Sequence, residues 1–279
     1  MIIDFHTHTF PDKIAAAAID KLQHASHSKA FTNGSVSGLQ ASMQSASIDH
    51  SVVLPVATNP LKVSAMNDIS CQLTGQNGLI YFGCIHPNME GAEAELTRIA
   101  GKGLKGIKIH PVYQDVDIED PRFLRILDKA GQLGLAVVMH AGDDIGFPGV
   151  VRCSPEMTAR ALRQVGPVKL ICAHMGGWRN WERVIDCLAG TSVMIDTAFS
   201  LGAITPLEEE YYKEEELRLL KEDTFCELVR AFGADQVVFG TDSPWDDQGA
   251  ALEAIRALTL TEEEKEKILG GNAQRILEI

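Results

Sequence analysis

The chain opens with Ile2-Ile3-Asp4-Phe5-His6-Thr7-His8, and this stretch decides how the rest is interpreted. If it is a β-strand, Ile2, Asp4, His6 and His8 share one face, because strand side chains repeat every second residue. The two imidazoles would then point the same way at the carboxyl end of the strand. Neutral imidazole is a strong ligand for zinc, so the pair could supply half of a coordination shell if later strands end in further ligands.

Length and composition limit the class of protein. The 279 residues suffice for one large barrel or two ordinary domains, and 45% hydrophobic with 23% charged residues is typical of a globular protein. A formal charge of -13 disfavours nucleic acid and anionic membranes as partners, because phosphate binding needs a basic face. Without a membrane-length apolar run or a signal-peptide pattern, we expect a cytoplasmic protein with a small-molecule substrate. The sequence allows a homodimer.

Six cysteines are scattered along the chain without a Cys-x-x-Cys pair. Cys84 and Cys172 lie inside apolar runs, where a thiol behaves as a small hydrophobic group. We therefore expect all six to be reduced and structural rather than part of a disulfide framework or a cysteine metal site.

Eight apolar, β-branched runs alternate with segments of helical periodicity, which indicates parallel strands buried on both faces. The runs are Ile2–His8, Ser51–Val56, Leu79–His86, Gly106–His110, Ala136–His140, Lys169–His174, Ser192–Thr197 and Gln236–Asp242. Eight such units predict a single-domain α/β fold over residues 1–279, a (β/α)8 TIM barrel with extra helices at the C-terminus. Residues 201–222, with the charged stretch Glu208–Lys221, are expected to form an insertion after strand seven, largely helical and solvated rather than a moving lid.

Helix signals fill the intervals between the strands. Expected helices are Pro11–Ala25, Ser37–Ala46, Val63–Asn77, Glu90–Lys102, one from Asp120 to about Gly131, one from Ser154, Arg179–Leu188, Asp223–Phe232, Asp246–Leu258 and Thr261–Leu277. Thr261 and Glu264 have the spacing of a capping box, which predicts a helix beginning near Glu262.

Seven polar or ionisable groups lie at matching places in five of the eight runs, at the rim where the reacting groups of such barrels lie. They are His6 and His8 on strand one, Lys108 and His110 on strand four, His140 on strand five, His174 on strand six and Asp242 on strand eight. As core residues, each would need its own buried partner, so a shared site explains them better.

The chemistry of these groups suggests how they divide. A catalytic divalent ion takes three or four protein ligands and lowers the pKa of bound water, and His6, His8, His140 and Asp242 can supply that shell. His174 is then left to move protons beside the ion, and Asp242 could also accept a proton from the water.

The motifs together resemble a known family. Asp4-Phe5-His6-Thr7-His8, the histidine ending strand five, Ala173-His174-Met175-Gly176-Gly177, Gly240-Thr241-Asp242-Ser243-Pro244 and Gly271-Asn272-Ala273 are similar to motifs of the amidohydrolase superfamily. The most similar branch is the amidohydrolase-2 group, which includes aminocarboxymuconate-semialdehyde decarboxylase, aromatic-acid decarboxylases and lactone hydrolases. The resemblance runs from the first strand to the last helix.

The resemblance implies one divalent ion, usually zinc, bound by His6, His8, His140 and Asp242, with His174 as acid/base or additional ligand. In binuclear branches a carboxylated strand-four lysine bridges two metals, and Lys108 could take that place, although an unmodified Lys108 fits this branch better. The main expectation is hydrolysis of a lactone, ester or amide. The alternatives are non-oxidative decarboxylation of an aromatic or unsaturated acid, and metal binding without turnover.

Further candidates lie near the expected rim. His86 and His110 each precede a proline that signals a turn, and either could contact substrate. Asp4 is expected to face inward, either to orient an imidazole or a buried lysine or to serve as a structural hydrogen-bonding group, and Asp196 to make supporting polar contacts rather than to take part in catalysis. Loop residues that could bind a substrate carboxylate or cover a flat ring are Arg152, Trp178, Arg179 and Trp245, with Arg179 better explained as a helix-surface residue.

Overall fold

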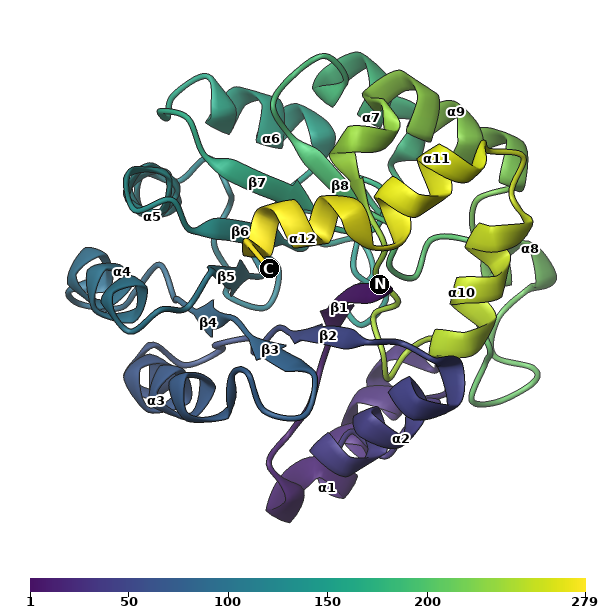
Figure 1. Ribbon diagram of the computed structural model, residues 1–279, viewed down its shortest axis with the longest axis horizontal. Helices are drawn as coiled ribbons and strands as arrows, with labels where there is room; N and C mark the ends of the chain where they lie inside the picture. The colour runs from purple at the N-terminus through teal and green to yellow at the C-terminus, as the bar shows by residue number, and fades with distance from the viewer.

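The computed structural model describes all residues, 1–279, and its strands form a closed parallel barrel inside a ring of helices (Figure 1). The strands are β1 (Ile3–Thr7), β2 (His50–Val53), β3 (Leu79–Tyr81), β4 (Gly83–Cys84), β5 (Gly106–Ile109), β6 (Ala136–Met139), β7 (Lys169–Cys172), β8 (Met194–Asp196) and β9 (Val237–Val238). They pair in parallel and in sequence order, β1 to β3 in one sheet and β4 to β9 in another.

Two sets of backbone hydrogen bonds join these sheets into eight barrel strands. β3 and β4 are separated by Phe82 alone, whose N–H donates to Val53 O at 3.0 Å, so together they make barrel strand three. On the other side, Phe5 N–H donates to Phe239 O at 2.7 Å and closes β1 onto β9. The predicted eight-stranded (β/α)8 barrel is therefore confirmed.

The helices are α1 (Asp12–Ser26), α2 (Val36–Ala46), α3 (Val63–Leu73), α4 (Ala92–Gly101), α5 (Pro121–Gln132), α6 (Pro155–Leu162), α7 (Trp181–Leu188), α8 (Glu214–Leu217), α9 (Glu222–Phe232), α10 (Gln248–Ala257), α11 (Glu262–Glu266) and α12 (Asn272–Leu277). Short 3-10 turns cover Pro60–Lys62 and Ala234–Gln236. The Thr261–Glu264 capping box forms as expected, but the last helix is interrupted by a π-turn over Lys267–Gly271. None of the helices has the length and apolar character needed to cross a membrane.

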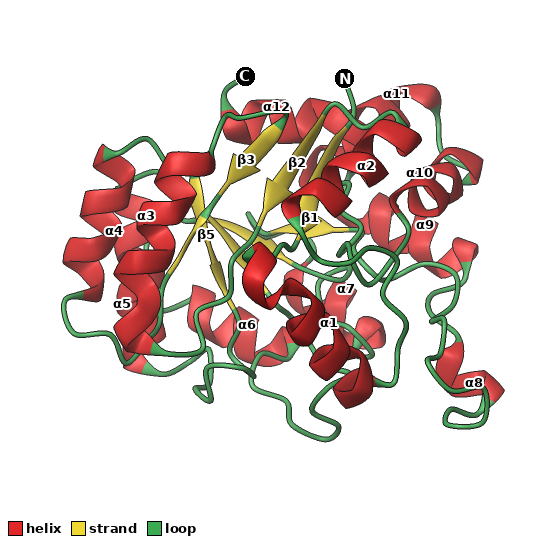
Figure 2. Cartoon of the chain, turned by 90° about the horizontal axis from the view of Figure 1, so that it is seen from below, coloured by secondary structure: helices red, strands yellow, loops and turns green.

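Two apolar layers hold the fold together. The larger one lies between the barrel and its surrounding helices. A second cluster collects side chains from strands all round the barrel together with Ala273, Ile276 and Leu277 of α12. Since those strands can meet only inside, α12 plugs the barrel interior at the end where both termini lie (Figures 1 and 2).

The first strand departs from strict alternation. Its pairing with β2 shifts register between Asp4 and Thr7. Ile3 and Phe5 both point into the interior, where the Phe5 ring packs edge-to-face on Phe82 with centroids 5.6 Å apart. Asp4 instead accepts a hydrogen bond from Gln248 of α10, so the expectation that Asp4 faces inward with the histidines is wrong. An irregularity of this kind re-aims side chains next to a functional site.

The insertion after β8 is mostly irregular, and its helix α8 lies at the edge of the molecule, on the side away from α12 (Figure 2). Its one helix is α8, so the largely helical expectation for Glu208–Lys221 is met over four residues only. The segment folds back on itself through bridges between Leu201 and Leu220 and between Ala203 and Arg218.

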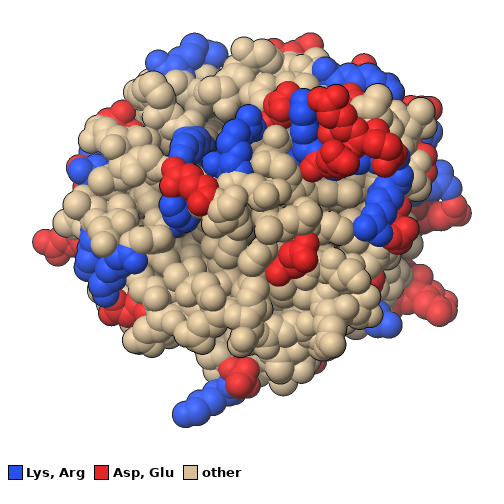
Figure 3. Space-filling view, in the orientation of Figure 1, with Lys and Arg blue, Asp and Glu red and all other residues tan.

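Charge is distributed without a basic face at the α12 end of the barrel. Figure 3 shows Lys and Arg interspersed with Asp and Glu there, and acidic side chains gathered over α11. This is compatible with the formal charge of -13.

Candidate metal centre

Three of the predicted ligands converge at the carboxyl end of the barrel. Asp242 Oδ1 lies 3.3 Å from His6 Nε2 and 3.1 Å from His8 Nε2. These three ligand atoms lie within 4.8 Å of one another. β1 carries His6, and His8 follows directly after its end. The backbone bond from Asp242 N–H to His6 O (2.8 Å) fixes the loop after β9 beside them.

The other predicted ligand, His140, lies next to His174. His140 Nδ1 is 3.1 Å from His174 Nε2, and the His174 ring in turn lies 5.3 Å from the His6 ring between centroids. His174 therefore connects the trio to His140. Both His174 (φ 59°) and Asp242 (φ 66°) adopt left-handed backbone conformations, a kind of strain that clusters at functional sites.

Backbone carbonyls and one carboxylate determine which ring nitrogens carry protons. A carbonyl oxygen only accepts, so the nitrogen facing it must be N–H, and the other nitrogen of a neutral ring is a lone pair. The protonated nitrogens are His8 Nδ1, facing Leu54 O at 2.7 Å, His140 Nε2, facing Asp143 O at 3.0 Å, and His174 Nδ1, facing Ala198 O at 3.0 Å. His6 Nδ1 likewise donates to Asp196 Oδ2 at 2.7 Å.

The remaining lone pairs face one another and the carboxylate. They belong to His6 Nε2, His8 Nε2, His140 Nδ1 and His174 Nε2. Lone pairs at 3.1 Å, as between His140 and His174, repel unless a cation or a proton lies between them. Each ring also donates its second nitrogen to an oxygen, as histidines that bind metals almost always do. The donor set therefore fits a divalent cation such as zinc, for which histidine and carboxylate are ordinary ligands.

Burial supports the same protonation states. It lowers the pKa of His6 and of His140 well below the ordinary value, and neighbouring positive groups lower both further, so both rings are neutral. The pKa of Asp242 lies below its usual range although burial alone would raise it, so its carboxylate is ionised. Neutral imidazoles and an ionised carboxylate are the forms that bind metals.

Two buried aspartates hold this arrangement from outside. Asp196, predicted to support the site, accepts the His6 Nδ1 proton, and its other oxygen accepts from His174 N–H at 2.8 Å. Asp4 accepts from Thr241 N–H at 3.0 Å and Thr241 O–H at 2.6 Å, next to Asp242. Each of the two carboxylates thus ties together segments that are far apart in sequence.

Lys108 is fully buried beside His6, with Nζ 2.9 Å from His6 Nε2. Since that nitrogen is a lone pair, the lysine can donate to it when no cation is bound there. Burial lowers the pKa of Lys108 to about 8. The position allows either an unmodified lysine or the carboxylated bridge that the resemblance implies, so the state of Lys108 stays a prediction.

The remaining predicted residues divide into three groups. Trp178 and Phe199 form an apolar cluster with Ile204 and Leu219 above the rim, and Trp245 packs against it. Arg152 donates to Asp115 and, at 2.9 Å, to Asp117, so its guanidinium is already paired. His110 lies with His140 and Asp144 in a second group of ligand-type side chains, whereas His86 Nδ1 accepts from Asn88 N–H at 3.1 Å in a turn.

The sequence reasoning missed Asp144 and Phe199. Asp144 follows His140 in the same strand-to-helix loop, and a carboxylate in that place was a signal that could have been used. Phe199 carried no comparable signal, because its place beside Trp178 depends on the path of the insertion. Arg179 lies with its guanidinium 4.9 Å from the Trp178 ring centroid and donates to Arg218 O at 2.9 Å.

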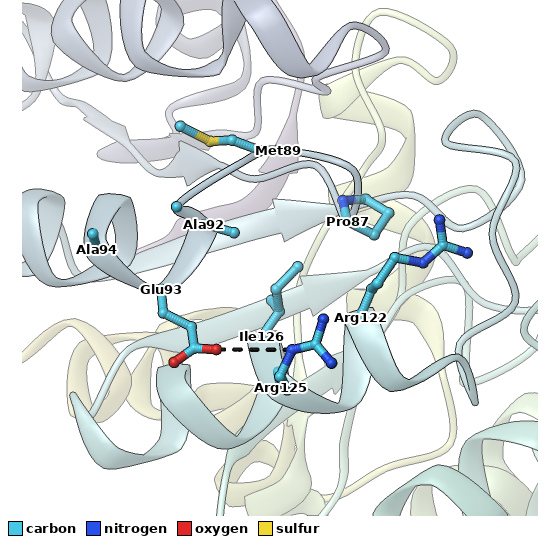
Figure 4. A pocket seen from close by; sticks show the side chains of 9 residues that line it. Pro87, Met89, Ala92, Glu93, Ala94, Arg122, Arg125 and Ile126 are labelled. Carbon is cyan, nitrogen blue, oxygen red and sulfur yellow. Dashed lines mark ion pairs between the residues drawn. The ribbon is translucent and has the colours of Figure 1, made fainter.

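A separate hollow between α4 and α5 contains none of these groups (Figure 4). Its charged side chains are already paired, Glu93 with Arg125 at 3.8 Å and Arg122 with Asp120 at 2.7 Å. We therefore place the functional site at the histidine cluster and not in this hollow.

Fold and site together define a parallel (β/α)8 barrel with a buried histidine and aspartate centre at its carboxyl rim. The amidohydrolase-2 family model, described as amidohydrolase, matches residues 3–279, and the chain belongs to this family. Its members are metal-dependent enzymes that include hydrolases and decarboxylases.

Individual relatives carry both kinds of activity in their names. The 2-amino-3-carboxymuconate-6-semialdehyde decarboxylase of Dictyostelium discoideum is 26% identical over 238 residues, 76% of this chain and 65% of that protein. The structure of 5-carboxyvanillate decarboxylase from Sphingomonas paucimobilis matches with TM-score 0.68 and 16% identity over 100% of this chain and 99% of that one. A Pseudomonas putida structure described as a 2-pyrone-4,6-dicarboxylic acid hydrolase matches with TM-score 0.65 and 18% identity over 99% and 97%.

Proposed function

We propose that this protein is a metal-dependent decarboxylase of a small aromatic or unsaturated carboxylic acid. The sequence analysis placed hydrolysis first, and the relative that is 26% identical supports reversing that order. The observation that carries the proposal is the grouping of His6 Nε2, His8 Nε2 and Asp242 Oδ1 within 4.8 Å of one another, with His174 beside His140 next to them. We assign His6, His8, His140 and Asp242 as ligands and His174 as the proton carrier.

A divalent cation at this centre would polarise an oxygen of the bound substrate and lower the pKa of a water molecule beside it. His174 holds its Nδ1 proton on Ala198 O, so Nε2 is the nitrogen that can take up and release a proton. His174 Nε2 would first take up a proton from water; in decarboxylation the carbon–carboxylate bond then breaks, carbon dioxide leaves, and His174 Nε2 delivers that proton to the carbon that keeps the electron pair. The apolar cluster of Trp178 and Phe199 offers a wall against which a flat substrate can pack.

Hydrolysis of a lactone, ester or amide is the second candidate. The observation that favours it is the ionised, nine-tenths buried Asp242 carboxylate, which can accept a proton from an attacking water. The two reactions use the same side chains and differ in the bond that breaks, so only the products separate them.

The test combines metal analysis with a substrate panel of aromatic acids, unsaturated acids, lactones and amides. Decarboxylation predicts carbon dioxide release, lost on chelation and restored by zinc. Acid release without carbon dioxide would establish hydrolysis instead, and bound metal without turnover of any compound would support a binding protein.

Substitution of His174 tests the assignment of roles. His174→Ala should lower kcat by at least about a hundredfold while metal content stays at the wild-type level, because general acid catalysis contributes about 10² to 10⁴. His6→Ala and His140→Ala should lower metal content as well as activity. His24→Ala, on the exposed face of α1, is the matched control and should change neither. Full activity of His174→Ala would contradict the proposed proton carrier.

A further inference from the structure

A second group of ligand-type side chains lies directly behind the metal centre. His110 Nε2 is 3.4 Å and His140 Nε2 3.8 Å from Asp144 Oδ2, and all three residues are more than nine-tenths buried. Two histidines and one carboxylate in such proximity have the composition of a second cation site. The hydrogen bonds around the two rings decide whether they can act as one.

The nitrogens that face Asp144 both carry protons. Tyr113 N–H donates to His110 Nδ1 at 3.3 Å, which makes Nδ1 the lone pair. The proton of the neutral His110 ring is therefore on Nε2, the nitrogen that lies 3.4 Å from Asp144 Oδ2. His140 Nε2–H is likewise donated to Asp143 O at 3.0 Å. Neither nitrogen offers a lone pair to a cation beside Asp144.

The stacking of the rings suggests what this group does instead. His110 and His140 stack with centroids 4.1 Å apart and planes 9° from parallel, and Tyr113 stacks on the other side of His110 at 3.9 Å. One hydrogen bond to Asp143 O leaves the His140 ring free to tilt about that bond. Contact with a flat neighbour removes this freedom and keeps Nδ1 directed at the centre.

We propose that His110 is a positioning residue that fixes the ring plane of His140, and that the His110–His140–Asp144 group binds no cation. Asp144 and Tyr113 in turn hold His110, one at each nitrogen. This inference rests on the proposed role of His140 as a metal ligand. It predicts that metal affinity depends on the flat ring of His110 and not on its N–H group.

Two substitutions separate the ring from the proton. His110→Phe keeps a flat ring for stacking but has no N–H, whereas His110→Gln keeps an N–H donor without a ring. Zinc affinity by chelator competition, the number of ions per chain and the visible spectrum of the cobalt form are measured for each. His50→Ala, at the start of β2, serves as the control, and circular dichroism checks folding.

We expect one tightly bound ion per chain in the wild type and in His110→Phe, with affinities within about threefold. His110→Gln should bind about tenfold more weakly, at the lower end of effects seen when support of a metal-bound histidine is lost, with a changed cobalt spectrum. If His110→Gln does not fold, His110→Leu replaces it as the ringless variant.

Two results would overturn the inference. One is wild-type affinity and spectrum in the ringless variants, and the other is two ions per wild-type chain with one lost in His110→Phe. A wild-type protein that binds no ion at all would instead overturn the proposed metal centre, so the two failures are distinguishable.

Discussion

At the scale of single residues, the centre depends on the tautomers of its histidines, which leave one unprotonated nitrogen of each ring facing the centre. His8, His140 and His174 each donate a hydrogen bond from one ring nitrogen to a main-chain carbonyl, and His6 donates one to Asp196. A carbonyl oxygen can only accept a hydrogen bond, so the backbone fixes the tautomers of these three histidines. The tautomer of His6 depends on a side chain and is therefore the one that mutation can switch.

Asp196→Asn tests this dependence. The asparagine can keep its oxygen on the N–H groups of His174 and Ala198, at 2.8 and 3.1 Å, and then presents its NH2 group to His6 Nδ1. His6 must respond by moving its proton to Nε2, which removes the lone pair from the centre. We expect zinc affinity to fall by about 10- to 100-fold in chelator competition. Asp117→Asn, which alters an exposed partner of Arg152, should leave affinity unchanged. Unchanged affinity in Asp196→Asn would contradict the tautomer argument.

At the scale of elements, strand ends could be predicted from sequence far better than side-chain partners. Each run of apolar residues carries its own signal, and a parallel barrel brings its carboxyl ends together, so His6, His8 and Asp242 could be placed in one site. The register shift of β1 against β2 could not be predicted, because it depends on how the two strands pair and not on the residue spacing within Ile2–His8. Nor could the pairing of Arg152 with Asp115 and Asp117, which depends on how two loops pass each other.

Asp4 links β1 to the loop after β9 and to α10. Its titration should make the free energy of unfolding depend on pH. Burial raises its pKa to about 6 in the fold from 3.8. Between these values the folded protein holds a proton that the unfolded chain has lost. The stabilising contribution of Asp4 is thus complete below about pH 4 and falls by about 3 kcal/mol as the pH rises through 6. The Asp4→Asn variant has no carboxyl group to ionise at this position, so it should not show this loss of stability. Denaturant unfolding of both proteins at pH 4 to 7, with chelator present, should show their difference in unfolding free energy shrink accordingly. A constant difference would contradict the raised pKa.

At the scale of the whole molecule, the proposed ligands come from barrel strands one, five and eight, with His174 on strand six, and the chain between His8 and Asp242 includes almost the entire fold. The centre can therefore exist only in the closed barrel. Closure itself depends on few bonds, such as Phe5 N–H to Phe239 O and Asp242 N–H to His6 O, helped by α12 plugging the opposite end. A cation that bridges strands one and eight would reinforce this seam.

Metal binding should for this reason stabilise the protein as a unit. A ligand that binds the folded state alone adds RT ln(1 + [L]/Kd), about 2.7 kcal/mol at a free zinc concentration one hundred times the dissociation constant. Calorimetry of metal-free and zinc-loaded protein should therefore show a single transition that moves upward with zinc. His6→Ala and His140→Ala should lose most of that shift, whereas His174→Ala should keep it, since His174 carries protons in our assignment. An equal shift in His6→Ala and wild type would mean that zinc binds elsewhere. Loss of the shift in His174→Ala alone would make His174 a ligand, which its Nε2 lone pair facing His140 Nδ1 at 3.1 Å allows.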